Sequence, residues 1–179
     1  MPVTRPLSAE DAAALAALLA ANRDFLAPWQ PLRRPGYFTE EGQRQAVTRA
    51  LEAREAGLAL PMVIQDDGGA VVGTMNLQSI IRGSFQSCSV GYWLAESAQG
   101  RGLATAALRE AVTVAFDDLR LHRVQAETLS QNYRSQRVLE RLGFSQYGKA
   151  ESYMQIAGEW QTNVLYQLIT PTPERVEIG

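Results

Sequence analysis

Histidine and cysteine each occur only once in the 179 residues, as His122 and Cys88. Disulfides and zinc clusters need several such side chains, so the sequence excludes both and predicts no metal centre. A Ser-His-Asp triad that uses any other histidine is excluded as well. We expect Cys88 to pack in the core, because no spare histidine can activate it. His122 opens a predicted strand and is expected to be structural rather than a catalytic base.

The sequence also lacks an excess of basic residues and a long apolar run. Its 17 Lys and Arg against 19 Asp and Glu give a net charge of -2. This balance lacks the basic patch that binding to nucleic-acid phosphates requires. The apolar residues 12–21 follow Glu10 and Asp11, which are the wrong flanks for a signal peptide, and are too few for a membrane span. We therefore expect a cytoplasmic protein that binds neither nucleic acid nor a membrane.

Apolar periodicity and turn residues predict regular structure along most of the chain. Helices are expected from the N-cap Ser8 to about residue 22, from Thr39 to Gly57, over 103–116 and over 132–143. Strands are expected over 58–65, 70–81, 87–94, 122–129, 152–157 and 160–169, the first three as an antiparallel meander. One strand-helix-strand crossover and a C-terminal hairpin follow. The pattern predicts a single domain over residues 1–179, of the α+β (mixed α/β) class with a mixed sheet.

The stretch QGRGLA at residues 99–104 opens a helix with two glycines, directly after a predicted strand. Glycine at a helix start lets an anion, typically phosphate, approach the main-chain N–H groups. A Walker A loop is excluded, because no Gly-Lys-Ser/Thr is present. A dinucleotide fingerprint matches at Gly100, Gly102 and Glu127, but Thr105 replaces its third glycine and too few strand-helix units remain. A tight turn with close helix packing stays open as an alternative.

The same loop carries a resemblance to a known family. Gln99-x-x-Gly102-x-Ala104 fits the Q/R-x-x-G-x-G/A signature of the GNAT acetyltransferase superfamily, with Gly91-Tyr92-Trp93-Leu94 before it and Asn132-x-x-Ser135 and Gly143-Phe144 after it. Residues 22–29, 82–85 and 158–165 are most similar to the Rim-type branch, and within it to the RimJ-type ribosomal-protein-alanine N-acetyltransferases. The resemblance covers nearly the whole chain. It implies a twisted, mostly antiparallel sheet with helices on both faces and a splayed strand pair that binds acetyl-CoA.

The resemblance also implies which residues bind acetyl-CoA as the cosubstrate. The loop amides would hold the pyrophosphate, and the backbone of the preceding strand would hold the pantetheine arm. One amide of that strand would face the thioester oxygen. Arg101 would add charge, whereas Arg109 is better explained as a solvated helix residue. The implied binding residues are Tyr92, Trp93, Leu94, Gln99, Gly100, Arg101, Gly102, Leu103, Ala104, Thr105, Asn132 and Ser135.

Asn132 and Ser135 lie three residues apart and so share one face of a first helical turn. By resemblance, Asn132 bonds the pantetheine, and the Ser135 hydroxyl lies near the sulfur and protonates the leaving thiolate. Both residue types also suit helix N-capping, and this alternative stays open.

The general base is less clearly indicated. Many relatives carry a glutamate where this chain has Ser89, and a frequent acid is replaced by Ala106. Glu127, Glu151 and Tyr133 remain as candidates, with a structural or solvated residue as the alternative for each, and water can serve instead.

The implied acceptor pocket involves Phe25, Trp29, Phe85 and Trp160, with core packing as the alternative for each. The leading hypothesis is an enzyme that transfers acetyl to a protein N-terminal α-amino group, specifically the N-terminal alanine of a small-subunit ribosomal protein. A second hypothesis keeps the chemistry with a small amine, amino acid or antibiotic as acceptor. A third is a ribosome-associated assembly factor that binds acetyl-CoA without needing turnover. A monomer or a homodimer is expected.

Overall fold

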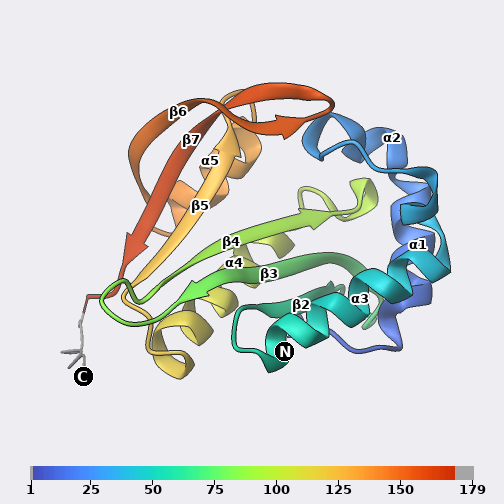
Figure 1. The fold of residues 1–179 in the computed structure, drawn as a ribbon, viewed down its shortest axis with the longest axis horizontal. Coiled ribbons are helices and arrows are strands. Elements are labelled where there is room, and N and C mark those ends of the chain that lie inside the picture. The colour runs from blue at the N-terminus through green and yellow to red at the C-terminus, as the bar shows by residue number, and fades with distance from the viewer. Residues whose placement is uncertain (1, 172–179) are drawn as a thin grey trace.

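The computed structural model describes residues 2–171, and Figure 1 shows how its elements are arranged. The strands are β1 (Thr4–Pro6), β2 (Leu60–Gln65), β3 (Val71–Ile81), β4 (Ser87–Leu94), β5 (Arg123–Leu129), β6 (Ser145–Ile156) and β7 (Glu159–Ile169). The helices are α1 (Asp11–Ala21), α2 (Arg23–Leu26), α3 (Glu40–Glu55), α4 (Leu103–Thr113) and α5 (Tyr133–Arg141). Short helical turns are Ala27–Trp29, Pro35–Phe38, Glu96–Ala98 and the π-helical Val114–Asp118. Each predicted helix and strand is present. Within the described range, no helix combines the length and apolar character that crossing a membrane requires.

The strands form one sheet in the order β1-β2-β3-β4-β5-β7-β6. All neighbouring pairs are antiparallel except β4 and β5, which are parallel and are connected through α4. This confirms the predicted meander, crossover and C-terminal hairpin, and the mixed, mostly antiparallel sheet. That residues 1–179 form a single domain stays a prediction.

Helices cover both faces of the sheet. On one face, Leu15 of α1, Val47 of α3 and Val63 of β2 belong to one buried cluster. On the other face, Ile64 packs in a larger cluster that includes Leu108 of α4. Successive strand residues point to opposite faces, which is why neighbours in β2 enter different clusters. In Figure 1, α3 accordingly lies in front of the sheet and α4 behind it.

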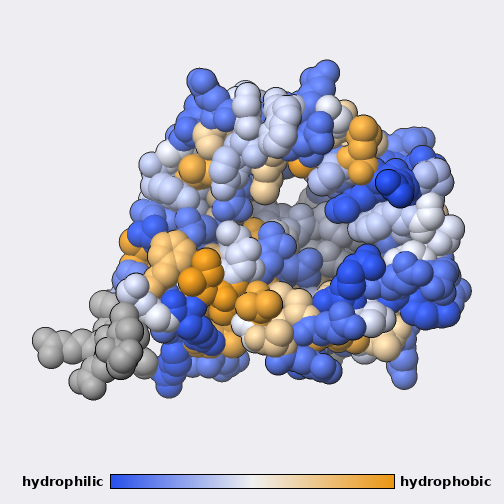
Figure 2. Space-filling model, in the orientation of Figure 1, coloured by the Kyte–Doolittle hydropathy of each residue, from blue (hydrophilic) through white to orange (hydrophobic). Residues whose placement is uncertain are grey.

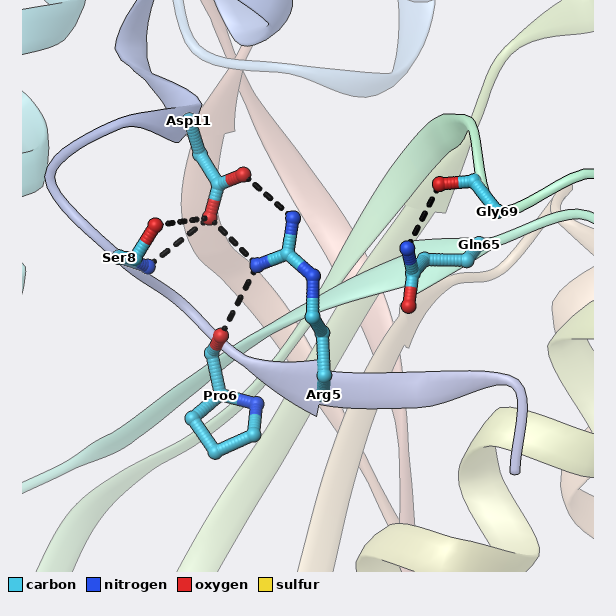
Figure 3. Close-up of polar contacts among 6 residues, drawn as sticks. All are labelled: Arg5, Pro6, Ser8, Asp11, Gln65 and Gly69. Carbon is cyan, nitrogen blue, oxygen red and sulfur yellow. Dashed lines mark hydrogen bonds and ion pairs between the residues drawn. The ribbon is translucent and has the colours of Figure 1, made fainter. Parts of the chain in front are cut away.

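The start of α1 differs from the prediction. The helix begins at Asp11, and no side chain caps it, so the predicted N-cap role of Ser8 is wrong. Instead, the Asp11 carboxylate accepts hydrogen bonds from the Ser8 N–H, at 2.8 Å, and from two Arg5 nitrogens, at 2.8 and 2.6 Å (Figure 3). The hydrogen bonds from Arg5 lower the pKa of Asp11. The acid of the first turn therefore ties β1 to α1.

Two strands differ from the prediction: β6 is longer than expected, and β1 was not expected. β6 begins at Ser145, whereas the pattern predicted a start at residue 152. Residues 145–150 are mostly exposed and show no apolar alternation, so the pattern did not indicate a strand there. β1, with three residues, was not predicted. β6 also contains a bulge, since its register against β7 shifts between Ala150 and Met154, and Ser152 in it has a positive φ of 47°.

Cys88 and His122, the one cysteine and the one histidine of the sequence, both have structural roles. Cys88 is buried in the core, and burial raises the pKa of its thiol to about 12. The main chain of His122 is bonded to Gln86, at 2.7 Å, and to Thr170, at 3.0 Å. Among residues 2–171, no group of three or more His, Cys, Asp or Glu is arranged to hold a metal ion.

Candidate active site

The parallel strands β4 and β5 are paired at one end only. Their register covers residues 87–89 of β4 and 123–125 of β5. Beyond these positions β4 continues along β3, and β5 continues along β7, so the two strands diverge (Figure 1). The splayed strand pair that the resemblance implied is therefore present.

Two hollows open from this gap, and Figure 2 shows an opening in the molecule beside the β6–β7 hairpin. The first, of about 530 Å³, is lined by residues that include Tyr92, Leu94, Gln99, Ala104, Asn132, Tyr133 and Ser135. The second, of about 460 Å³, is lined by residues that include Asn76, Gln78, Gly91, Glu127, Met154 and Asn163. Leu26, Trp29, Tyr92, Trp93, Asn132 and Ser135 line both. The two hollows therefore meet in the gap.

The glycine loop stands at the start of α4. Gly100 and Gly102 have positive φ angles of 74° and 78°, a conformation that favours glycine. A Cβ atom at either position would meet nothing within 4 Å, so close packing against the helix is not what selects glycine here. Gly102 is the N-cap and offers no side-chain acceptor to the first amides of α4, from Gly102 to Thr105. The loop thus presents unpaired N–H groups to open space.

The two arginines near the loop are exposed side chains in different settings. Arg101 lies 3.1 Å from Asp67 of the β2–β3 turn, which holds it beside the loop. Arg109 is exposed on α4. Only Arg101 is therefore part of the loop that leads into the helix.

Tyr92, Asn132 and Ser135 are brought together across the gap. Asn132 caps α5 by accepting the Ser135 main-chain N–H at 3.1 Å. The Ser135 hydroxyl lies 3.0 Å from the Tyr92 hydroxyl, a contact that the sequence did not indicate. Burial raises the pKa of Tyr92, so this phenol stays protonated and can share a proton with Ser135. Tyr133, the neighbouring candidate, lines the first hollow but is 65% exposed.

Glu127 lies in the second hollow, on β5. The Ser89 hydroxyl of β4 donates to its carboxylate at 3.2 Å, so the acid stands next to the position where many relatives carry a glutamate. Burial raises the pKa of Glu127. Burial and then the charge of Glu127 raise the pKa of Tyr153, a residue of the β6 bulge. Glu151, the other candidate acid, is exposed on the same bulge.

The four residues expected around the acceptor do not lie together. Phe25 and Trp29 line the first hollow, and Trp29 also lines the second. Trp160, on the β6–β7 hairpin, is 64% exposed and lines neither. The hairpin does contact the segment after Trp29, because the Ala157 N–H donates to the Gln30 carbonyl at 2.9 Å.

Phe85 lies outside the site. It belongs to the β3–β4 turn, at the end of the sheet where β4 and β5 are still paired, and it lines neither hollow. Figure 1 shows this turn at the opposite end of β4 from α2. The resemblance at residues 82–85 reflects a turn that closes the far side of the molecule. Phe85 is thus separated from the other predicted acceptor residues.

The fold and the gap are typical of a class of proteins in which two diverging parallel strands and the N-terminus of the following helix border one binding site. The family described as "Acetyltransferase (GNAT) domain" matches residues 3–145. This chain belongs to that family and is an acetyltransferase of the GNAT type.

Individual relatives extend the similarity over almost the whole length. "Probable N-acetyltransferase YjcK" of Bacillus subtilis is 36% identical, over 96% of this chain and 95% of that protein. The "[Ribosomal protein uS5]-alanine N-acetyltransferase" of Escherichia coli is 35% identical, over 97% and 91%. The structure of Mycobacterium smegmatis RimJ in complex with CoA-disulfide has a TM-score of 0.90 and 29% identity, and covers 95% of this chain and 84% of that one. RimJ-type acetyltransferases are thus among the near relatives.

Proposed function

We propose that this enzyme transfers the acetyl group of acetyl-CoA to the α-amino group of a protein N-terminus, the N-terminal alanine of a small-subunit ribosomal protein. The observation that supports this proposal is that two hollows, each with lining residues that the other lacks, meet in the gap between β4 and β5. Gln99 and Ala104 of the glycine loop line only the first hollow, Glu127 lines only the second, and Ser135 lines both. The relative that acts on alanine of uS5 supports this choice of acceptor. We expect the reaction to take place in the cytoplasm.

On the side of α4, the chain's groups suit acetyl-CoA. The unpaired amides at the start of α4 would hold the pyrophosphate, because an anion there satisfies N–H groups that the helix leaves free. The open edge of β4 near Tyr92, Trp93 and Leu94 would hold the pantetheine, and one of its amides would stabilise the oxyanion. Ser135, next to Tyr92, would give its proton to the leaving thiolate. Asn132 would orient this turn.

On the opposite side, Glu127 would accept the proton that the attacking amine loses. A raised pKa brings this carboxylate closer to the working pH, which favours proton transfer. The Ser89 hydroxyl orients it from β4. The neutral amine attacks the thioester carbon, the carbon–sulfur bond breaks, and the products are an N-acetylated chain and CoA.

Ser135→Ala is expected to lower kcat by about 10²-fold with little change in KM for acetyl-CoA, because a general acid acts in the transition state. The helix cap remains, since Asn132 bonds the main-chain N–H of residue 135 rather than its side chain. Steady-state kinetics with an Ala-initiated peptide measures both constants. An unaltered kcat would leave Ser135 without a chemical role.

An N-terminal α-amine is expected to react far better than a lysine side chain. Attack requires the neutral amine, and at pH 7.4 roughly a quarter of α-amines are neutral, against about 0.1% of lysines. We therefore expect kcat/KM to differ by about two orders of magnitude on this ground alone. The measurement compares an Ala-initiated peptide with the same peptide blocked at its N-terminus and bearing a free lysine. Equal rates would refute the acceptor, and faster acetylation of small amines would favour the second hypothesis.

A further inference from the structure

Asn163 of β7 is a buried residue whose side-chain oxygen is unpaired within the described part of the chain. The residue is 2% exposed, and it lines the same hollow as Glu127. Within residues 2–171, no group donates a hydrogen bond to its Oδ1. Burying a carbonyl oxygen without a donor is unfavourable, and most buried polar atoms are paired. No group within residues 2–171 supplies the donor that this oxygen needs, so a bound molecule can supply it.

Met154 determines how the Asn163 amide is oriented. The Asn163 Nδ2 donates to the Met154 Sδ at 3.8 Å. A thioether sulfur can only accept, so the NH₂ group must be the one directed at Met154. The Oδ1 atom is consequently the end that is left for another partner. Met154 comes directly after the β6 bulge, which shifts the register of this strand against β7.

Asn163 and Glu127 share one face of the sheet. Asn163 pairs with Leu129 in the antiparallel β5–β7 ladder, and Glu127 lies two residues before Leu129. Paired residues and residues two apart point to the same side. Diagonal neighbours of this kind are roughly 7–8 Å apart, within reach of a single small group. Thr128, whose buried hydroxyl also lacks a partner in the described part, lies between Glu127 and Leu129 and so points to the opposite face, although it too lines the second hollow.

We propose that Asn163 Oδ1 accepts a hydrogen bond from the first peptide N–H of the acceptor, while the acceptor's α-amine faces Glu127. This inference rests on the proposed function and names the group that selects chain termini within the same site. In an N-terminal residue, only the Cα and the carbonyl carbon separate the amine from the first peptide nitrogen. The α-amine of the first residue and the peptide N–H of the second are therefore close enough to serve as the two donors that the two side chains require.

This assignment makes Asn163 a specificity-determining residue. A lysine side chain or a simple alkylamine has no amide N–H at that spacing from its amine. A buried acceptor left unpaired disfavours such substrates, as in sites that reject analogues lacking one hydrogen-bonding group. Asn163 thus adds to the selection that amine pKa already imposes.

The test compares an Ala-initiated peptide with its depsipeptide, in which an ester oxygen replaces the first peptide N–H. The wild-type enzyme is expected to prefer the peptide by about tenfold in kcat/KM. Asn163→Leu is expected to remove this preference and to leave acetyl-CoA affinity unchanged. The peptide and the depsipeptide differ in the pKa of their α-amine. Both enzymes receive the same two substrates, so dividing the preference of the wild type by the preference of the variant cancels this difference. Leucine has a similar volume and removes the unpaired amide, and thermal denaturation checks the fold.

Gln155→Leu, on the exposed side of β6, is the matched control and is expected to keep the tenfold preference. Asn163→Ala serves as a second variant if the leucine variant does not fold. Equal reaction of peptide and depsipeptide in the wild type, or a preference that survives both Asn163 variants, would overturn this inference alone. Failure of the wild type to acetylate any α-amine would instead overturn the proposed function.

Discussion

Gly102→Glu is expected to abolish acetyl-CoA binding while the protein stays folded. Gly102 is the N-cap of α4, and a Cβ atom there would extend into open space beside unpaired amides. A glutamate would bring its own carboxylate to the place proposed for the pyrophosphate and would repel it. The positive φ of 78° adds a backbone cost of about 1 to 2 kcal/mol, too small to unfold a domain of this size. Calorimetry measures acetyl-CoA binding, and circular dichroism measures the fold.

Gly57→Glu is the matched control for this change. Gly57 follows α3, has a φ of 71°, and a Cβ atom there would also meet nothing within 4 Å. The backbone strain and the added charge are therefore comparable, but α3, which precedes Gly57, lies on the opposite face of the sheet from α4. We expect unchanged acetyl-CoA binding. Wild-type affinity in Gly102→Glu, or an equal loss in both variants, would contradict the assigned loop.

Glu127→Gln is expected to lower kcat/KM for an Ala-initiated peptide by about 10²-fold or more, because the proton of the attacking amine loses its acceptor. Burial raises the pKa of Glu127, so in the wild type this carboxylate becomes ionised, and active as a base, only as the pH rises through its raised pKa. The glutamine variant is expected to lack that rising limb and to retain only the titration of the amine itself. A pH profile of kcat/KM for both enzymes measures this.

Glu151→Gln is the control, because Glu151 is exposed on the β6 bulge and is not among the residues that line either hollow. We expect its pH profile to match the wild type. Acetyl-CoA affinity should be unchanged in both variants. A larger loss in Glu151→Gln than in Glu127→Gln would move the role of base to β6.

Local signals in the sequence were sufficient for most of the fold. The apolar periodicity over residues 58–65, 70–81 and 87–94 is a property of adjacent residues, and the meander was predicted from it. The first half of β6 carries no such signal, since its side chains are mostly exposed and its pairing depends on β7. Ser8 was misassigned because a serine ahead of a helix is a frequent cap, whereas here Asp11 accepts bonds from both Ser8 and Arg5.

The site was predictable where it lies within one segment. The glycine loop and the Asn132-x-x-Ser135 pair are such segments, and Gln99 and Ala104 of the loop line the first hollow together with Asn132 and Ser135. Contacts between strands could not be read from the sequence, because they depend on register. The contacts of Ser89 with Glu127 and of Asn163 with Met154 are of this kind. The contact of Tyr92 in β4 with Ser135 in α5 likewise depends on how elements far apart in the sequence pack together.

Where β4 and β5 diverge, each strand has an unpaired edge, although both strands lie in the middle of the sheet. Exposed strand edges normally invite pairing with other chains and lead to aggregation. Here the unpaired edges face each other inside the molecule, flanked by α2, α5 and the β6–β7 hairpin. Under the proposed function, the pantetheine of acetyl-CoA would enter this gap and bond to the strand edges as an added strand does. The cosubstrate would then complete the sheet during the reaction and leave the gap open again when it departs as product.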